Sequence, residues 1–411
     1  MNKTIVFSLL TLSLLTNVYA DEAKSSAEIM QNALSEMKAL VGEDSSKEEA
    51  KTEEKVEPKA KTEVKTEKKV EPKAEAEVKT EKKAEPKAKA EVKTEKKVEP
   101  KAEESTFTLG KYGTFKFEKA NANVSIMHGP VVGPNKENQG FMNNPAIIEA
   151  EHGLIIVDPG GNYNVGKKVL AEIRKVSNKP IIAVFNTHKH GDHWFANKAI
   201  AEAYPKVDIY ADTNMIRVSK EGEADVWYGI LNRATKGNLE GTKEFAFPTK
   251  ALNDGDEIEI DGQKFVVGHP KVAHTDTDLV ITHLNSKTIF LGDNVMKGRL
   301  GSFDESSSVL GNIELLEKIK KDTDLTLYVP GHGQSGKRDE TIDPFLNYLK
   351  VLAVEGKKAY EDDKESYEVK DEVYEKLIAL KDWDAFKKNM AAHLNKVMTE
   401  ISELDEDEDE E

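Results

Sequence analysis

The run Thr187-His-Lys-His-Gly-Asp-His-Trp194 constrains the fold of this chain more than any other segment. Its side chains with metal-binding groups are His188, His190, Asp192 and His193. Other candidate ligands each follow an apolar segment that reads as a buried strand, and they are His274, Asp293 and His332. These residues come from separate parts of the sequence, so they can share a site only if the fold gathers the ends of several strands. The sequence therefore predicts one composite metal site.

The spacing within the run predicts two neighbouring cations. The side chains of His188 and His190 point to the same side of an extended or looped backbone, so both imidazoles can reach one ion. Asp192 and His193 leave the turn at Gly191 in a different direction. The first ion is assigned to His188, His190 and His274, the second to Asp192, His193 and His332, and Asp293 is assigned as a bridge. Each ion keeps room for a shared water, which is the open position that catalytic zinc requires.

Such a pair of ions predicts hydrolytic chemistry. Two divalent charges lower the pKa of a bridging water to about neutrality, so that hydroxide can attack an ester, thioester or amide-like bond of a small-molecule substrate. Asp192 is predicted to orient this water as well as to bind metal. Imidazole and carboxylate ligands favour two Zn²⁺ ions but also suit iron or manganese.

The N-terminal part of the chain predicts export and a spacer rather than a folded domain. Residues 1–20 resemble a signal peptide, which indicates a periplasmic location. Residues 21–45 contain a short amphipathic segment, and residues 46–104 repeat with prolines at Pro58, Pro72, Pro86 and Pro100. Lysine and glutamate nearly balance in that repeat and large apolar residues are scarce, so a disordered linker is expected.

Composition excludes several other classes. The chain has no cysteine, so a disulfide or a thiolate ligand cannot form. After the signal region, no segment approaches the roughly 20 apolar residues of a membrane span. The net charge of −16 owes much to an acidic tail at residues 405–411, which is expected to be solvated, and no basic stripe indicates nucleic-acid binding. The linker or the tail could engage an envelope partner, whereas the oligomeric state stays open.

Between these ends, strands and helices alternate as in a layered α/β domain at residues 105–340, followed by a helical extension at 341–404. Strands are predicted at 114–117, 123–127, 146–149, 154–157, 181–185, 207–210, 257–260, 264–267, 279–282, 288–291 and 325–329. Helices are predicted at 164–176, 194–204, 213–219, 313–320 and within 344–404. Residues 221–248 have no clear period and are a candidate lid.

The order His-x-His-x-Asp-His followed by separate His, Asp and His ligands resembles the metallo-β-lactamase fold hydrolase superfamily. The resemblance covers about residues 106–333 and implies a four-layer αββα sandwich with the metals at one edge of the two sheets. It also implies that Asp158 orients a ligand rather than binding metal. Asp293 stands where one group of true β-lactamases uses cysteine, so the chain is more similar to glyoxalase II and to exported zinc hydrolases. A β-lactam hydrolase stays an alternative.

Further roles are assigned to residues outside the predicted ligand set. Substrate contacts are assigned to Trp227, Tyr228, Lys297 and Arg299, Lys189 is expected to point to solvent, and His269 is expected to be a core residue. Two further alternatives keep the same ligands. One is an iron-dependent, sulfur-metabolising oxygenase similar to persulfide dioxygenases, and the other is a non-catalytic envelope scaffold.

Overall fold

A computed structural model describes residues 106–410 of the chain. The predicted signal peptide at 1–20, the segment at 21–45 and the linker at 46–104 lie outside the described residues. No helix among the described residues is long and apolar enough to cross a membrane.

The first sheet contains seven strands in sequence order, antiparallel from β1 to β4 and parallel from β4 to β7. Its strands are β1 (Glu118–Lys119), β2 (Val124–Ile126), β3 (Ala146–Glu149), β4 (Leu154–Val157), β5 (Ile181–Phe185), β6 (Asp208–Asp212) and β7 (Lys250–Leu252). The predicted strand at 114–117 is wrong, because β1 begins only at Glu118 and Thr114 forms no more than an isolated bridge with Thr108.

The second sheet has the strand order β12-β11-β10-β9-β8. Its strands are β8 (Glu257–Ile260), β9 (Gln263–Gly268), β10 (Val280–His283), β11 (Thr288–Met296) and β12 (Leu327–His332). Neighbours are antiparallel except for the parallel pair β11 and β12. The turn between β8 and β9 has positive φ at Asp261 and Gly262, which is the conformation that a tight hairpin requires.

The described residues also form helices, some of which cover the outer faces of the two sheets. In chain order they are α3 (Tyr163–Val176), α4 (Gly191–Trp194), α5 (Asn197–Ala203), α6 (Thr213–Val218), α7 (Ala224–Ala234), α8 (Val309–Lys320), α9 (Arg338–Glu361), α10 (Ser366–Lys376) and α11 (Phe386–Glu410). The predicted helix at 194–204 corresponds to α5, whereas Trp194 ends the separate helix α4. The acidic run expected as a solvated tail continues α11 as far as Glu410.

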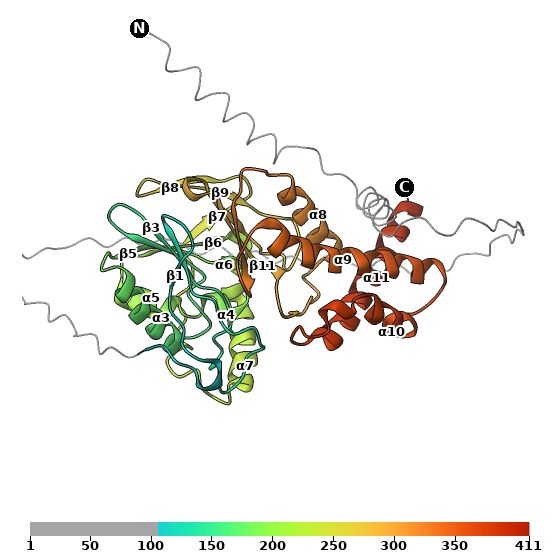
Figure 1. Ribbon diagram of the computed structural model, residues 1–411, viewed down its shortest axis with the longest axis horizontal. Helices are drawn as coiled ribbons and strands as arrows, with labels where there is room; N and C mark the ends of the chain where they lie inside the picture. The colour runs from blue at the N-terminus through green and yellow to red at the C-terminus, as the bar shows by residue number, and fades with distance from the viewer. Residues whose placement is uncertain (1–105, 411) are drawn as a thin grey trace, which may run out of the picture. The chain divides into compact units, whose positions relative to one another are not determined.

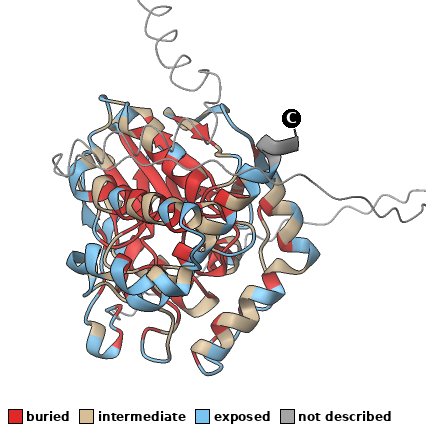
Figure 2. Cartoon of the chain, turned by 90° about the vertical axis from the view of Figure 1, so that its right-hand side faces the viewer, coloured by how far each residue is buried: buried red, intermediate tan, exposed pale blue. Residues whose placement is uncertain are grey.

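Side-chain alternation along the strands sets the order of the layers. In β4, Ile155 and Val157 pack between the sheets, whereas Leu154 and Ile156 pack against α3. In β11, Phe290 faces the other sheet and its neighbours face the helices α8 and α9. Figure 1 shows α3 and α5 on one side of the strands and α8 and α9 on the other, and Figure 2 shows that the buried residues concentrate in the central strands. The predicted αββα sandwich is confirmed.

Candidate metal centre

The histidine run forms the connection from β5 to α4. His188 and His190 lie in the loop, and the single turn of α4 carries Asp192 and His193. A side chain at Gly191 would overlap the Phe195 ring, so this position requires glycine. The indole nitrogen of Trp194 donates to the carbonyl of Lys189 at 2.9 Å, which closes the loop on the helix. All the ligand candidates of the run are buried.

The remaining candidates approach from the second sheet. His274 lies in the connection between β9 and β10, Asp293 lies within β11, and His332 ends β12. The pairing of β11 with β12 shifts on both sides of Gly292, which has a φ of 53°. Such irregularities redirect the following side chain. Asp293 therefore leaves the regular ladder and lies within 3.2 Å of Nε2 of both His193 and His332.

One group of side chains can hold a first cation. It consists of His188, His190, His274 and Asp293, whose potential ligand atoms all lie within 4.8 Å of one another. Nε2 of His274 is 3.1 Å from Nδ1 of His190 and 3.7 Å from Oδ2 of Asp293. The composition is the one predicted for the first ion together with its bridge.

A second group consists of Asp192, His193 and His332, again within 4.8 Å of one another. Oδ2 of Asp192 is 3.5 Å from Nε2 of His193 and 3.3 Å from Nε2 of His332. Nδ1 of His332 donates its proton to the carbonyl of Met142 at 2.8 Å. Nε2 of the same ring therefore carries no proton and can bind the metal. Asp293 contacts both groups, which is the position that a bridging carboxylate requires.

The buried atoms of the cluster fit a metal on their own chemistry. Nε2 of His188, His193 and His332 and Oδ1 of Asp293 are buried and have no hydrogen-bond partner among the described residues. Each buried polar group without a partner costs about 1–3 kcal/mol. Cations coordinated by these nitrogen and oxygen atoms would remove that cost, and the donor set suits zinc, iron or manganese.

The electrostatics separate the two groups. Burial and the neighbouring His193 lower the pKa of His188 well below its usual value, and burial lowers the pKa of His274 to about 3. Both rings are therefore neutral, as metal ligands must be. Burial alone would lower the pKa of His193, but nearby carboxylates, first among them Asp192, outweigh burial and raise it.

The pKa values of the two carboxylates in the cluster are lowered rather than raised by their neighbours. Burial would raise the pKa of Asp293, but His332 and His193 hold it well below its usual range, and His193 and His332 likewise lower the pKa of Asp192. Both carboxylates are ionised at neutral pH. The charge of these carboxylates raises the pKa of the neighbouring His193 and His332.

Lys189 differs from expectation. It is buried, and Nζ lies 2.8 Å from both Oδ1 of Asp276 and Oγ of Ser306. The prediction that it points to solvent was wrong, because an acidic partner from the β9–β10 connection neutralises it inside the protein. Lys189 therefore ties the histidine loop to two other segments.

The predicted substrate contacts divide into near and far residues. The ring centroid of Trp227 lies 4.2 Å from that of His190, so this side chain of α7 covers the first group. Tyr228 instead contacts Phe245 and Lys243. The candidate lid at 221–248 thus contains a helix. Of its two aromatic candidates for substrate contact, Trp227 has a ring contact with a predicted metal ligand.

Of the two basic candidates, Arg299 lies behind the ring of a predicted ligand. Nη1 of Arg299 lies 3.4 Å from Nδ1 of His332 and 3.3 Å from the sulfur of Met142, on the side of the ring away from the metal-facing Nε2. The backbone of Lys297 packs against Gly333. His269 does not belong to the metal cluster, since its Nδ1 contacts the carbonyl of Asp278 at 2.6 Å.

Three supporting groups were missed from the sequence. Thr187 lies between Asp158 and His188, Asp304 approaches Nε2 of His190 at 3.8 Å, and Asn294 accepts from the backbone NH of His274 at 3.2 Å. Thr187 and Asn294 directly adjoin predicted ligands, which is a signal that could have identified them. Asp304 carries no such signal, because its loop reaches the site only through the tertiary fold.

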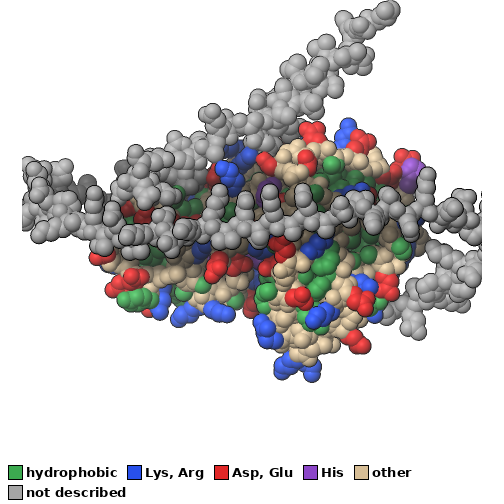
Figure 3. All heavy atoms as spheres, turned by 180° about the vertical axis from the view of Figure 1, so that it is seen from behind, with side chains coloured by type: hydrophobic (Ala, Val, Ile, Leu, Met, Phe, Trp, Pro, Cys, Tyr) green, Lys and Arg blue, Asp and Glu red, His purple; other side chains and the backbone are tan. Residues whose placement is uncertain are grey.

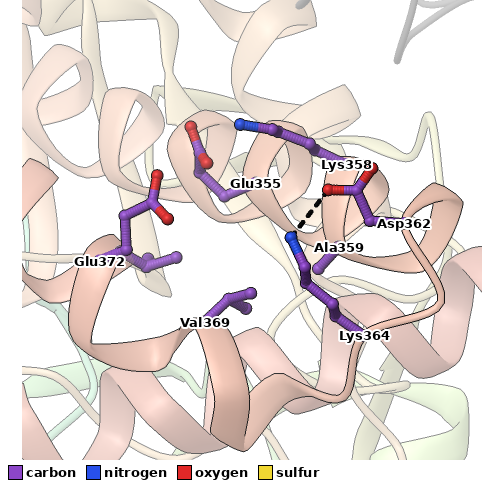
Figure 4. A pocket seen from close by; sticks show the side chains of 8 residues that line it. Glu355, Lys358, Ala359, Asp362, Lys364, Val369 and Glu372 are labelled. Atoms are coloured by element: carbon purple, nitrogen blue, oxygen red, sulfur yellow. Dashed lines mark hydrogen bonds and ion pairs between the residues drawn. The ribbon is translucent and has the colours of Figure 1, made fainter.

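Several charged groups elsewhere on the described surface pair with one another. Basic and acidic side chains are interspersed on the face shown in Figure 3. Figure 4 shows a small hollow between α9 and α10, in which Lys364 pairs with Asp362 at 2.9 Å. Lys376 pairs with Glu355 at 2.7 Å beside it. Exposed pairs of this kind stabilise the fold weakly and indicate no ligand.

Comparison with known proteins identifies the domain. A family model described as the Metallo-beta-lactamase superfamily matches residues 139–332, which include every predicted ligand. This part of the chain is a metallo-β-lactamase superfamily domain. The double mutant of the sec-alkyl sulfatase PisA1 has a similar fold, with a TM-score of 0.55 and 13% identity over 70% of this chain and 50% of that one.

Curated relatives of the domain include an alkylsulfatase and a hydroxyacylglutathione hydrolase. The chain is 28% identical over 237 residues to a linear primary-alkylsulfatase of Pseudomonas sp., a match that covers 49% of this chain and 43% of the relative. It is 26% identical over 164 residues to a hydroxyacylglutathione hydrolase of Gloeobacter violaceus, covering 39% of this chain and 51% of the relative. The chain therefore spans about half the length of these two relatives. They support the predicted class, a metal-dependent hydrolase.

Proposed function

We propose that the chain is a binuclear zinc hydrolase that cleaves an ester, thioester or amide-like bond in a small molecule. The observation that carries this proposal is the convergence of buried imidazole and carboxylate groups with unpartnered atoms aimed at one another. The presence of Asp293 between the two groups supports a shared centre rather than two separate sites.

Each residue of the cluster has a defined role in such a reaction. His188, His190 and His274 would hold one ion, Asp192, His193 and His332 the other, and Asp293 would bridge them. Zinc ions bound there would supply Lewis acidity and a water whose pKa is near neutrality. Asp192 would orient this water, because its carboxylate is ionised and buried against His193 and His332.

The substrate class rests on the relatives. An alkylsulfatase and hydroxyacylglutathione hydrolases are among the proteins similar to this domain, so sulfate esters and acylglutathiones are the first candidates. Trp227 beside His190 supports a substrate with an apolar group. We also propose that the protein acts in the periplasm, because residues 1–20 have the features of an export signal.

Metal analysis of the purified protein followed by a substrate panel tests the proposal. The panel contains an alkyl sulfate, an acylglutathione, a lactone, a phosphodiester, a β-lactam and a persulfide. The expected result is two zinc ions per chain and turnover of one hydrolysable substrate. Coloured protein that contains iron and consumes oxygen with the persulfide would instead establish the oxygenase alternative.

Matched variants link the activity to the cluster. His190→Ala and Asp192→Ala should each lose bound metal and turnover. His269→Ala is the control, because His269 ends a neighbouring strand but contacts a backbone carbonyl instead of the cluster. Full metal content and turnover in the His190 and Asp192 variants would refute the assignment.

A further inference from the structure

Residues 300–308, here called the bracing loop, support the side of the metal centre that contains His190 and His274. Oγ of Ser307 donates to the carbonyl of His274 at 2.7 Å, and the backbone NH of Ser308 donates to the carbonyl of Ala273 at 2.7 Å. Oδ2 of Asp304 lies 3.8 Å from Nε2 of His190. The bracing loop thus fixes the backbone of one ligand and faces the ring of another.

The start of the bracing loop is held by the C-terminal helix α11. Nδ2 of Asn389 donates to the carbonyls of Leu300 and Gly301, both at 2.7 Å. Nε2 of His393 donates to the carbonyl of Gly301 at 3.0 Å, and its Nδ1 accepts from the hydroxyl of Tyr348 at 2.7 Å. The position of His393 is therefore determined on both sides of its ring.

The end of the bracing loop is held by Glu400, about two turns further along α11 than His393. Its carboxylate accepts from the backbone NH of Val309 at 2.8 Å, from the backbone NH of Leu310 at 3.0 Å and from Oγ of Ser308 at 3.0 Å. Glu400 is buried. A buried carboxylate requires such donors, so this contact fixes where α8 begins and where the bracing loop ends.

We propose that Asn389, His393 and Glu400 are positioning residues of the metal centre. Their spacing of four and seven residues places them on one face of α11, and this face holds both ends of the bracing loop. The inference rests on the proposed metal centre but does not depend on the substrate. It makes the C-terminal helix a part of the site, although α11 supplies no ligand.

The proposal predicts an effect on one of the two ions. The second group is positioned by other contacts, since Asp158 lies 2.8 Å from Nδ1 of His193 and the carbonyl of Met142 lies 2.8 Å from Nδ1 of His332. Loosening the bracing loop should therefore disturb His190 and His274 and leave the second group in place. A purely structural role of α11 would not discriminate between the two ions.

Cobalt titration of the full chain tests this selectivity. Asn389→Leu and Glu400→Gln should weaken the binding of one Co²⁺ ion about tenfold, the lower end of the range for residues that support metal ligands, and leave the other ion unchanged. His274→Ala and His332→Ala identify which absorption change belongs to which ion. Lys388→Leu and Glu403→Gln alter exposed residues of the same helix and should change neither affinity.

Equal weakening of both ions, or unchanged binding in correctly folded variants, would overturn the proposal. Hydrogen exchange of the wild-type chain gives a test that no misfolded variant can obscure. Because coupling is reciprocal, Zn²⁺ should slow exchange in residues 300–310 and around 389–400 of α11. Metal binding without added protection there would contradict the proposal. A chain that binds metal but turns over no substrate would defeat only the proposed reaction.

Discussion

Asp158 accepts a hydrogen bond from Nδ1 of His193 at 2.8 Å through Oδ2, and the same oxygen accepts from Oγ1 of Thr187 at 2.7 Å. Since Thr187 donates its hydroxyl proton to Asp158, it can only accept from Nδ1 of His188, which lies 3.1 Å away. One carboxylate therefore fixes a ligand in each metal group and leaves Nε2 of both rings as the ligand atom.

The backbone NH of Thr187 also donates to Oδ1 of Asp158 at 2.9 Å. Asp158→Asn should weaken metal binding about 10- to 100-fold, because the amide can no longer accept from all three donors. A competition titration with a zinc chelator measures the loss. Asp371→Asn, at an exposed position of α10, is the matched control and should retain wild-type affinity. Unaltered affinity in Asp158→Asn would show that the orientation of His188 and His193 does not depend on this carboxylate.

Glycine at position 331 makes room for the bridging carboxylate. A Cβ at Gly331 would overlap Oδ1 of Asp293, and the backbone next to it belongs to the irregular part of β11. Gly331→Ala should therefore displace Asp293 and reduce the metal content to one ion or none, as determined by elemental analysis. In Gly133→Ala the added methyl group would come no closer than 3.9 Å to a neighbouring atom, Oδ2 of Asp384, so this variant should keep both ions. Two tightly bound ions in Gly331→Ala would exclude Asp293 as the bridge.

The ligands could be predicted from the sequence because their chemistry is local. His188, His190, Asp192 and His193 are adjacent in the chain, and strands that deliver His274, Asp293 and His332 have strong apolar patterns. The structure brings all of them together. Asp158 came only from the family resemblance, because its distance of 35 residues from His193 carries no pattern of its own.

The incorrect strand prediction at 114–117 and the missed contacts of α11 have identifiable physical causes. Phe115 and Phe117 alternate as in a strand, but they are buried in the apolar cluster that contains Phe107 and Phe141 rather than by pairing with a neighbouring strand. Alternation of apolar and polar residues indicates which side of a segment is buried, but not whether the segment forms hydrogen bonds with a neighbouring strand. The contacts of α11 with the bracing loop join residues about 90 apart, such as Asn389 and Leu300, so no local pattern could indicate them.

His393 should make stability depend on pH. Burial lowers its pKa from 6.5 to about 4, although the hydrogen bond to the carbonyl of Gly301 acts in the opposite direction. The folded pKa lies below the unfolded one, so this stability is fully present above pH 6.5 and is lost as the pH falls through about 4. The loss amounts to at most about 3 kcal/mol.

Urea unfolding of metal-free wild type and of His393→Gln between pH 4 and pH 7.5 measures this contribution. The free energy of unfolding of the wild type should fall more steeply toward acid pH than that of the variant. The difference between the two proteins removes the contribution of the other histidines, including His283, whose pKa burial also lowers to about 4. Parallel pH profiles would show that His393 is not held neutral in the folded chain.

Trp227 should determine the preference for apolar substrates without holding metal. Its ring lies 4.2 Å from that of His190 at an angle of 37°, so it forms a wall beside the first metal group. Trp227→Ala should raise the KM for an ester with a long alkyl group about tenfold, since burial of an apolar side chain is worth about 1.5–3 kcal/mol. The KM for a short homologue should change little. Tyr228→Ala is the control, because Tyr228 contacts Phe245 and Lys243 instead. Steady-state kinetics over a series of alkyl chain lengths, with metal content measured in parallel, tests whether Trp227 contacts substrate. The same change in KM at every chain length would instead show that Trp227 serves only in packing.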